Sequence, residues 1–150
     1  MNDYSKRMRK LIGKEPLLMA AAGAIIYKDR KILLQRRSDN GTWAIHGGAL
    51  ELGETVEEAV KRELREEIGI VPTKLRLYKI FSGEDMHWKY PNGDEAYCVN
   101  VVFLCDEYEG ELKQDDDEVV ELKWFDVDNL PENINAPVDR AILKDIELAI

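Results

Sequence analysis

The amino-acid sequence predicts an α/β or α+β sandwich, in which helices pack on a β-sheet. Segments typical of strands fill most of the chain, and helical patterns occur near its start, in its middle and at its end. No repeat, low-complexity linker or break in composition divides the 150 residues. We therefore expect a single domain, residues 1–150, that is large enough to bury a core.

The first part of the chain predicts a short helix followed by a hairpin. The helix is basic and ends near Gly13 and Pro16, which are typical of helix termini. The expected elements are a helix over residues 3–12 within an N-terminal extension of residues 1–16, a buried strand over 17–27, its hairpin partner over 32–37, a loop over 38–41 and a short segment over 42–46.

The strongest helix signal covers Thr55–Ile68. Thr55 is a good N-cap, and Glu58 stands three residues later, as in a capping box. Gly69 follows the helix, where a glycine readily adopts the left-handed conformation that ends helices. The sequence therefore fixes both ends of this helix.

The second half of the chain predicts three strands and a final helix. A polar loop, residues 83–95, separates the first two strands, and an acidic loop, residues 109–118, separates the last two. The C-terminal helix has apolar residues at helical spacing, and we expect it to cover the sheet or to meet a second subunit of a homodimer. The expected elements are strands over 74–83, 95–108 and 118–127 and a helix over 137–150.

Composition and cysteine spacing bound the class of protein. A net charge of −9 argues against binding to nucleic acid backbone or to an anionic membrane. The longest apolar run has eleven residues, too few to cross a bilayer, and no secretory signal is visible. Cys98 and Cys105 are seven residues apart in one strand, on opposite faces, so we expect no disulfide and a cytoplasmic protein.

The central helix carries an unusual group of glutamates. Its apolar stripe is formed by Val56, Ala59, Val60, Leu64 and Ile68. On a helical wheel, Glu63 and Glu67 lie on the same side as this stripe, and Glu66 lies at its edge. Like charges one turn apart destabilise a helix by a few tenths of a kcal/mol per pair. A purely solvent-facing helix would not turn these carboxylates toward the protein.

Carboxylates crowded toward the protein must be protonated, paired with basic groups or bound to a metal ion. Arg62 by itself cannot neutralise three of them. A hard divalent cation would relieve both the repulsion and the burial, and it would let an acidic protein hold an anionic diphosphate. Gly47, Gly48 and Gly53 permit tight turns and close backbone approach to an ion or phosphate. The ligand spacing of a calcium-binding EF-hand is absent.

The stretch "GGALELGETVEEAVKRELREEIGI", residues 47–70, resembles the Nudix box. Its defined positions are filled by Gly48, Glu54, Arg62, Glu63, Leu64, Glu66, Glu67, Gly69 and Ile70. From residue frequencies, a chance match is roughly one in ten million per starting position. The resemblance implies the Nudix fold, an α/β/α sandwich around a mixed β-sheet.

The resemblance also implies hydrolysis of a nucleoside diphosphate linked to another moiety, with Mg²⁺ or, as a substitute, Mn²⁺. Glu63, Glu66 and Glu67 would be metal ligands, and one of them could serve as the base. Gly48 would offer its backbone carbonyl to the metal. Arg62 would orient a box carboxylate, and Glu54 would support the loop before the helix.

Some Nudix enzymes take the catalytic base from outside the box. Glu118, before the last strand, is the first candidate here and Glu95 the second; alternatively, the acidic turn at 115–118 is simply solvated. Many relatives have proline directly before the paired glycines, whereas this chain has His46, which we expect to be a loop residue rather than a metal ligand.

Substrate contacts are expected from two other segments. Arg36 and Arg37 end a strand and could hold phosphate, but neighbours in a strand point to opposite faces, so one of them is expected to do so. A surface ion pair is the alternative for either arginine. Trp88 and Tyr90, in the polar loop, could stack on a nucleobase or pack the loop against the protein.

The resulting hypothesis is a Mg²⁺-dependent pyrophosphohydrolase with a small-molecule nucleotide substrate. ADP-ribose or another nucleotide sugar is preferred on overall likeness to the family, and nucleoside triphosphates and dinucleoside polyphosphates stay as alternatives. The competing hypothesis of another class is a noncatalytic domain that binds a nucleotide as a sensor.

Overall fold

The computed structural model describes residues 3–114 and 117–150, so Asp115 and Asp116 of the expected acidic loop lie outside the described residues. The elements are α1 (Asp3–Ile12), β1 (Leu17–Lys28), β2 (Lys31–Arg37), β3 (Trp43–Ala44), β4 (His46–Ala49), α2 (Val56–Ile68), β5 (Val71–Phe81), η1 (Glu84–Met86), β6 (His87–Lys89), β7 (Glu95–Glu109), β8 (Val119–Asp126), α3 (Val138–Leu143) and η2 (Ile146–Leu148).

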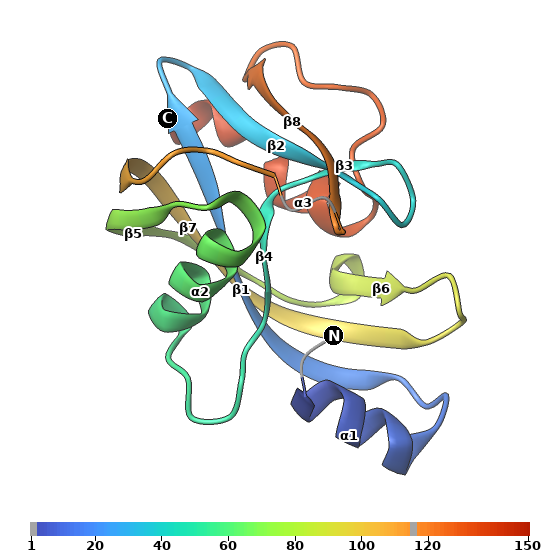
Figure 1. Cartoon of the computed structure of the whole chain (residues 1–150). Coiled ribbons are helices and arrows are strands. Elements are labelled where there is room, and N and C mark those ends of the chain that lie inside the picture. Colours follow the sequence, from blue (N-terminus) through green and yellow to red (C-terminus); the bar gives the residue numbers. More distant parts are fainter. Residues whose placement is uncertain (1–2, 115–116) are drawn as a thin grey trace.

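The described strands form one mixed sheet, and β1 organises it (Figure 1). On one side β1 pairs in parallel with β7 over ten positions. On the other side it changes partner: residues 21–24 pair with β4, and residues 26–28 pair with β2, both antiparallel. Because β2 and β4 both leave β1 near residue 25, the sheet opens between them.

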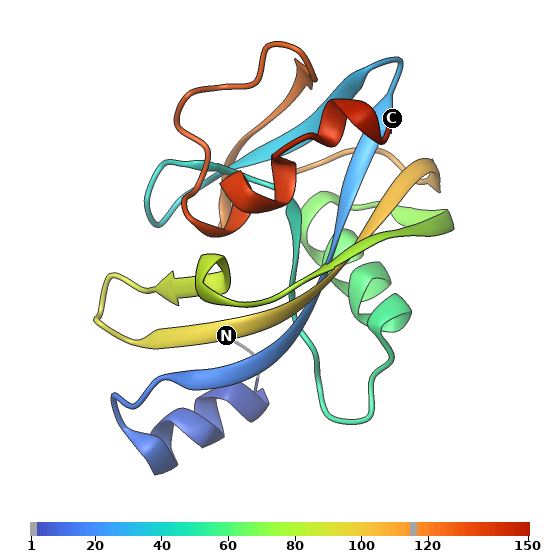
Figure 2. The same ribbon diagram turned by 180° about the vertical axis from the view of Figure 1, so that it is seen from behind.

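Helices cover both faces of the sheet, as an α/β/α sandwich requires. Successive residues of a strand point to opposite faces, so Ile25 and Ile26 belong to different cores. Ile26 packs with the apolar stripe of α2, and Ile25 packs with Ile142 and Ile146 from the C-terminal segment. Figures 1 and 2 show α2 and α3 on opposite sides of the sheet and α1 beside the start of β1.

The caps expected for the central helix are present. The Thr55 side chain accepts a hydrogen bond from the Glu58 backbone N–H, and the Glu58 side chain accepts one from the Thr55 N–H. Gly69 is left-handed, with φ of 76°. Cys98 and Cys105 are both buried and free, in different apolar clusters, as their spacing predicted.

Three sequence-based expectations need correction. The polar loop 83–95 contains the short strand β6, which pairs with the start of β7. The C-terminal helix is interrupted because Lys144 is extended and Asp145 is left-handed, with φ of 62°. Strand β5 begins before Pro72, which an edge strand with irregular pairing tolerates. Within the described residues, no helix is long and apolar enough to cross a membrane.

Candidate active site

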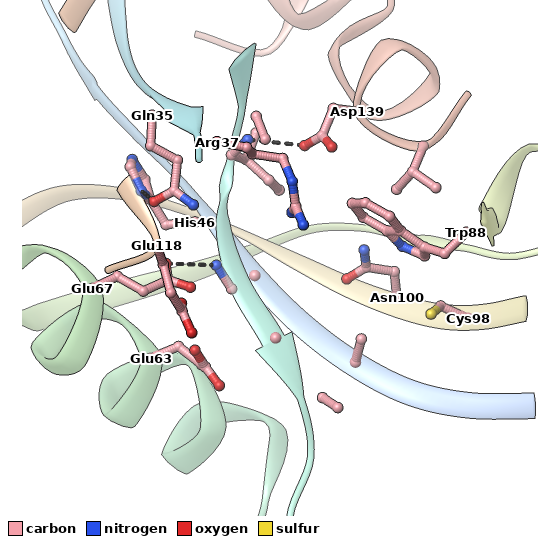
Figure 3. A pocket seen from close by; sticks show the side chains of 18 of the residues that line it. Gln35, Arg37, His46, Glu63, Glu67, Trp88, Cys98, Asn100, Glu118 and Asp139 are labelled. Atoms are coloured by element: carbon pink, nitrogen blue, oxygen red, sulfur yellow. Dashed lines mark hydrogen bonds between the residues drawn. The ribbon is translucent and has the colours of Figure 1, made fainter. Parts of the chain in front are cut away.

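The opening between β2 and β4 leads into a cavity of about 380 Å³. Residues of β1, β4 and β7 form its floor, α2 and Glu118 contribute an acidic side, and Trp88 and Tyr90 form an aromatic wall (Figure 3). Asp139 of α3 also lines the cavity. The cavity therefore brings together residues from both halves of the chain.

Two of the three helix glutamates expected to bind metal line this cavity. Glu67 is 4% exposed, and one of its carboxyl oxygens lies 3.3 Å from the backbone N–H of Gly47, which donates to it. Glu63 is half-buried and lines the cavity as well. The side chain of Glu66 is 57% exposed at the edge of the helix, outside the cavity lining. The helical wheel predicted this arrangement.

Arg62 ties the acidic side to the loop before α2. Its guanidinium donates two hydrogen bonds to Glu54, of 2.7 and 3.0 Å, and one of 2.7 Å to Glu63. A further bond of 3.1 Å reaches the Ala49 carbonyl oxygen. These bonds to Arg62 hold the pKa of Glu54 below its usual value. Arg62 thus fixes the loop at both Ala49 and Glu54.

The cavity destabilises the charged forms of Glu63 and Glu67. Burial raises the pKa of Glu67 well above its usual range, and the charges of Glu63 and Glu118 raise it further. Burial also raises the pKa of Glu63, although Arg62 opposes this shift. The contact between the two carboxyl groups raises the pKa of Glu67 and lowers that of Glu63. A cation bound between these side chains would stabilise their charged forms.

The chemistry of these residues fits a divalent cation. Their donors are carboxylate oxygens, which Mg²⁺ prefers, and Gly48 lets the backbone approach them closely. A Cβ at Gly48 would lie 2.6 Å from a carboxylate oxygen of Glu63, so another residue there would displace that side chain. Among the described residues, no three His, Cys, Asp or Glu side chains already form a metal-ligand group. Arg62 contacts Glu63 at 2.7 Å and the partly exposed Glu66 at 3.6 Å, so both carboxylates are paired with the same guanidinium.

The two candidates for a base outside the box occupy different places. Glu118 lines the cavity, and its charge acts on Glu67. Glu95 lies outside the cavity lining, and His87 contacts it at 2.8 Å. The geometry therefore favours Glu118.

Of the two adjacent arginines, Arg36 and Arg37, only Arg37 lines the cavity. Arg37 lines the cavity, with its guanidinium 4.8 Å from the centre of the Trp88 ring and two hydrogen bonds, of 2.9 and 2.6 Å, to Asp39. Arg36 lies outside the cavity lining, 3.4 Å from Glu121. Trp88 and Tyr90 stack with ring centres 6.2 Å apart.

His46 is not the loop residue that the sequence suggested. It begins β4 and is fully buried. One ring nitrogen contacts the Gln35 side chain at 2.8 Å and the other contacts the Leu33 carbonyl at 3.1 Å. Burial lowers its pKa to about 4, so the ring is neutral. His46 links β4 to β2 across the opening of the sheet.

Asp139 and Asn100 are among the cavity residues that sequence reasoning missed. Asp139 accepts hydrogen bonds of 2.9 Å from the Ile45 N–H and from the Asn135 amide. The available signal in the sequence was an aspartate directly after Val138, in a segment whose apolar residues recur at helical spacing. Asn100 interrupts the small residues Ala96 and Cys98 on one face of β7, which is a signal at period two.

Comparison with known proteins identifies the class of protein that this fold and site define. Residues 17–146 match the NUDIX domain family, and the chain belongs to that family. The ADP-ribose pyrophosphatase of Methanocaldococcus jannaschii is 40% identical over 143 residues, covering 87% of this chain and 80% of that protein. The NAD-capped RNA hydrolase NudC of Vibrio vulnificus is 36% identical over 108 residues, covering 71% of this chain but 38% of NudC.

The fold comparison agrees. The crystal structure of a MutT NUDIX hydrolase from Burkholderia pseudomallei matches with a TM-score of 0.72 and 30% identity, over 86% of this chain and 98% of that one. The chain is therefore an enzyme, a Nudix pyrophosphohydrolase, and the noncatalytic sensor is set aside. Nudix hydrolases generally use a divalent metal ion.

Asp139 predicts a pH dependence of stability. Burial raises its pKa from the ordinary 3.8 to about 6, so the folded protein binds more protons than the unfolded chain between these values. The stability that this group contributes is present below pH 4 and is lost as pH rises through 6, by roughly 3 kcal/mol in total. We expect the stability difference between wild type and Asp139→Asn to fall by about this amount from pH 4 to pH 7 in urea unfolding.

The exposed Asp128 provides the control, because its side chain is 68% exposed. The difference between wild type and Asp128→Asn should stay constant to within about 0.5 kcal/mol over the same range. If the difference in unfolding free energy between wild type and Asp139→Asn is equally independent of pH, the raised pKa of Asp139 is contradicted.

Proposed function

We propose that the enzyme hydrolyses the pyrophosphate bond of a nucleoside diphosphate linked to another moiety, with ADP-ribose as the representative substrate and Mg²⁺ as the metal. The observation that carries the proposal is the buried Glu63–Glu67 pair at one end of a cavity whose other end has an aromatic wall. An acidic end suits a metal-bound diphosphate, and an aromatic wall suits a base. The relative from M. jannaschii, named as an ADP-ribose pyrophosphatase, supports the choice of substrate.

Glu63, Glu66, Glu67 and the backbone carbonyl of Gly48 would hold the metal. When bound, Mg²⁺ neutralises diphosphate oxygens and lowers the pKa of a coordinated water. Mn²⁺ is the expected substitute. Arg62 positions Glu63 through the 2.7 Å hydrogen bond and keeps the loop around Gly48 in place through Ala49.

The remaining side chains handle the proton and the substrate. A carboxylate oxygen of Glu118 would accept the proton of the attacking water, since Glu118 lies beside Glu67 in the cavity lining. Arg37 would hold substrate phosphate or ribose oxygens. The rings of Trp88 and Tyr90 would stack on the base. Burial shields the resulting charges from water and so strengthens their interactions.

A side-by-side assay tests this proposal. ADP-ribose, ATP and diadenosine tetraphosphate are each incubated with the protein and Mg²⁺, and the products are identified by mass. We expect AMP and ribose 5-phosphate from ADP-ribose, with the highest kcat/KM of the three, and no turnover in excess EDTA. A higher kcat/KM for ATP would show that ADP-ribose is not the preferred substrate. Undiminished turnover in EDTA would show that the reaction does not need a metal ion.

Glu67→Gln tests the acidic pair, because it removes a negative charge while nearly keeping the shape of the side chain. We expect kcat for ADP-ribose to fall by at least about 100-fold. Without metal, the Tm of the variant should equal or exceed that of wild type. The substitution removes a buried carboxyl group whose charged form is destabilised by burial and by neighbouring charges. The matched control is Glu57→Gln, on the exposed face of the same helix. A fully active Glu67→Gln enzyme would refute the role.

Glu118→Gln separates proton transfer from metal binding. We expect kcat to fall by about 100-fold or more, and the concentration of Mg²⁺ needed for half-maximal rate to change less than threefold. Glu95→Gln is the control, because Glu95 contacts His87 outside the cavity lining. If Glu95→Gln is the slower enzyme, the assignment of the base moves to Glu95.

A further inference from the structure

Asn100 places a polar side chain beside Trp88 and Cys98 in the cavity lining. It lies on β7 between Cys98 and Val102, on the strand face that Ala96 also shares. Figure 3 shows its amide directed into the cavity that Trp88 and Cys98 also line. The diphosphate end, marked by Glu63 and Glu67, is formed by a different element, α2.

The amide oxygen of Asn100 is buried and has no hydrogen-bond partner in the described structure. Other polar side chains around the cavity are paired: Asp139 with Ile45 and Asn135, and Arg37 with Asp39. A buried acceptor without a partner costs about 1–3 kcal/mol. A leucine at this position would avoid that cost, so the amide is a feature that folding alone does not favour.

A ligand that supplies an N–H group at this point would remove the cost. The neighbouring aromatic wall of Trp88 and Tyr90 selects a flat ring, and a base with an exocyclic amino group carries the required donor on its edge. The amide can at the same time donate to a ring nitrogen, as Asn does when it reads adenine. The buried oxygen therefore favours an amino-bearing base over one with a carbonyl oxygen in the same place.

We propose that Asn100 is a specificity-determining residue that accepts a hydrogen bond from the exocyclic amino group of the substrate's base, so that the cavity prefers adenine to hypoxanthine. The proposal rests on the proposed function, because it takes the cavity as the nucleotide site. It adds the group that is recognised and the residue that recognises it.

The alternative orientation of the amide, turned by 180°, would pair with a carbonyl-bearing base instead. Two variants separate these cases. Asn100→Asp keeps an acceptor and removes the donor, since an ionised carboxylate only accepts. Asn100→Leu removes both groups and keeps a side chain of similar length.

The kinetic experiment compares three substrates: ADP-ribose, its inosine analogue, and bis(5-ribosyl) diphosphate, which has no base. We expect Asn100→Leu to lower kcat/KM for ADP-ribose by about 10- to 100-fold, mainly through KM, and to bring the adenine-to-hypoxanthine ratio close to one. Turnover of the base-free compound should change less than twofold. Asn100→Asp should keep the preference for adenine.

Asn129→Leu is the matched control, because Asn129 is exposed on a turn after β8. It should change none of these values. An equal loss of kcat/KM on all three substrates in Asn100→Leu would show a structural role and overturn the proposal, and so would a wild-type preference for hypoxanthine.

Binding measurements separate this inference from the proposed function. If no diphosphate is hydrolysed, the proposed function fails, and calorimetry with AMP, IMP and ribose 5-phosphate then tests Asn100 by itself. We expect AMP to bind wild type about tenfold more tightly than IMP and the difference to vanish in Asn100→Leu. Equal affinity of wild type for AMP and IMP, or no binding of AMP, would overturn the proposal.

Discussion

The guanidinium of Arg62 joins the central helix to the loop before it, and the geometry of the acidic site depends on this junction. Three acceptors converge on it: the Glu54 carboxylate, the Glu63 carboxylate and the Ala49 carbonyl oxygen. The first and last of these fix the two ends of the glycine-containing loop, and the second orients a carboxylate in the cavity. One side chain therefore sets the position of the backbone and of the charge together. A lysine could not do this, because it lacks the planar fork of donors.

Buried polar groups hold the cavity open where the sheet changes partners. β1 leaves β4 for β2 near residue 25, and such a break would leave unpaired backbone groups if nothing spanned it. His46 spans it on one side through Gln35 and the Leu33 carbonyl. Asp139 spans it on the other by accepting the Ile45 N–H. His46 lies two residues before Gly48, and Asp139 binds Ile45, three residues before Gly48. The contacts that join the strands therefore also position the backbone of the site.

The aromatic wall is supported by the N-terminal segment, which precedes the part of the chain that matches the family. Lys14 donates 2.8 and 3.0 Å hydrogen bonds to Asp94 and to the Asn92 carbonyl in the turn between β6 and β7. Arg9 donates to the Glu95 carbonyl at 2.9 Å. The α2 part of the acidic side is thus held by contacts within residues 47–70, whereas the aromatic side is held by α1 and the turn that follows β6.

The sequence by itself determined the central helix, its caps and the inward direction of Glu63 and Glu67, because each depends on residues within a few turns of one another. The tertiary structure alone decided which of Arg36 and Arg37 reaches the cavity, that Glu118 rather than Glu95 lies beside Glu67, and that the loop 83–95 contains a strand. The tertiary structure alone also decided that Asn100 and Asp139 line the cavity. Their surroundings come from β1, β4 and α3, which are far apart in sequence, and local periodicity carries no information about such contacts.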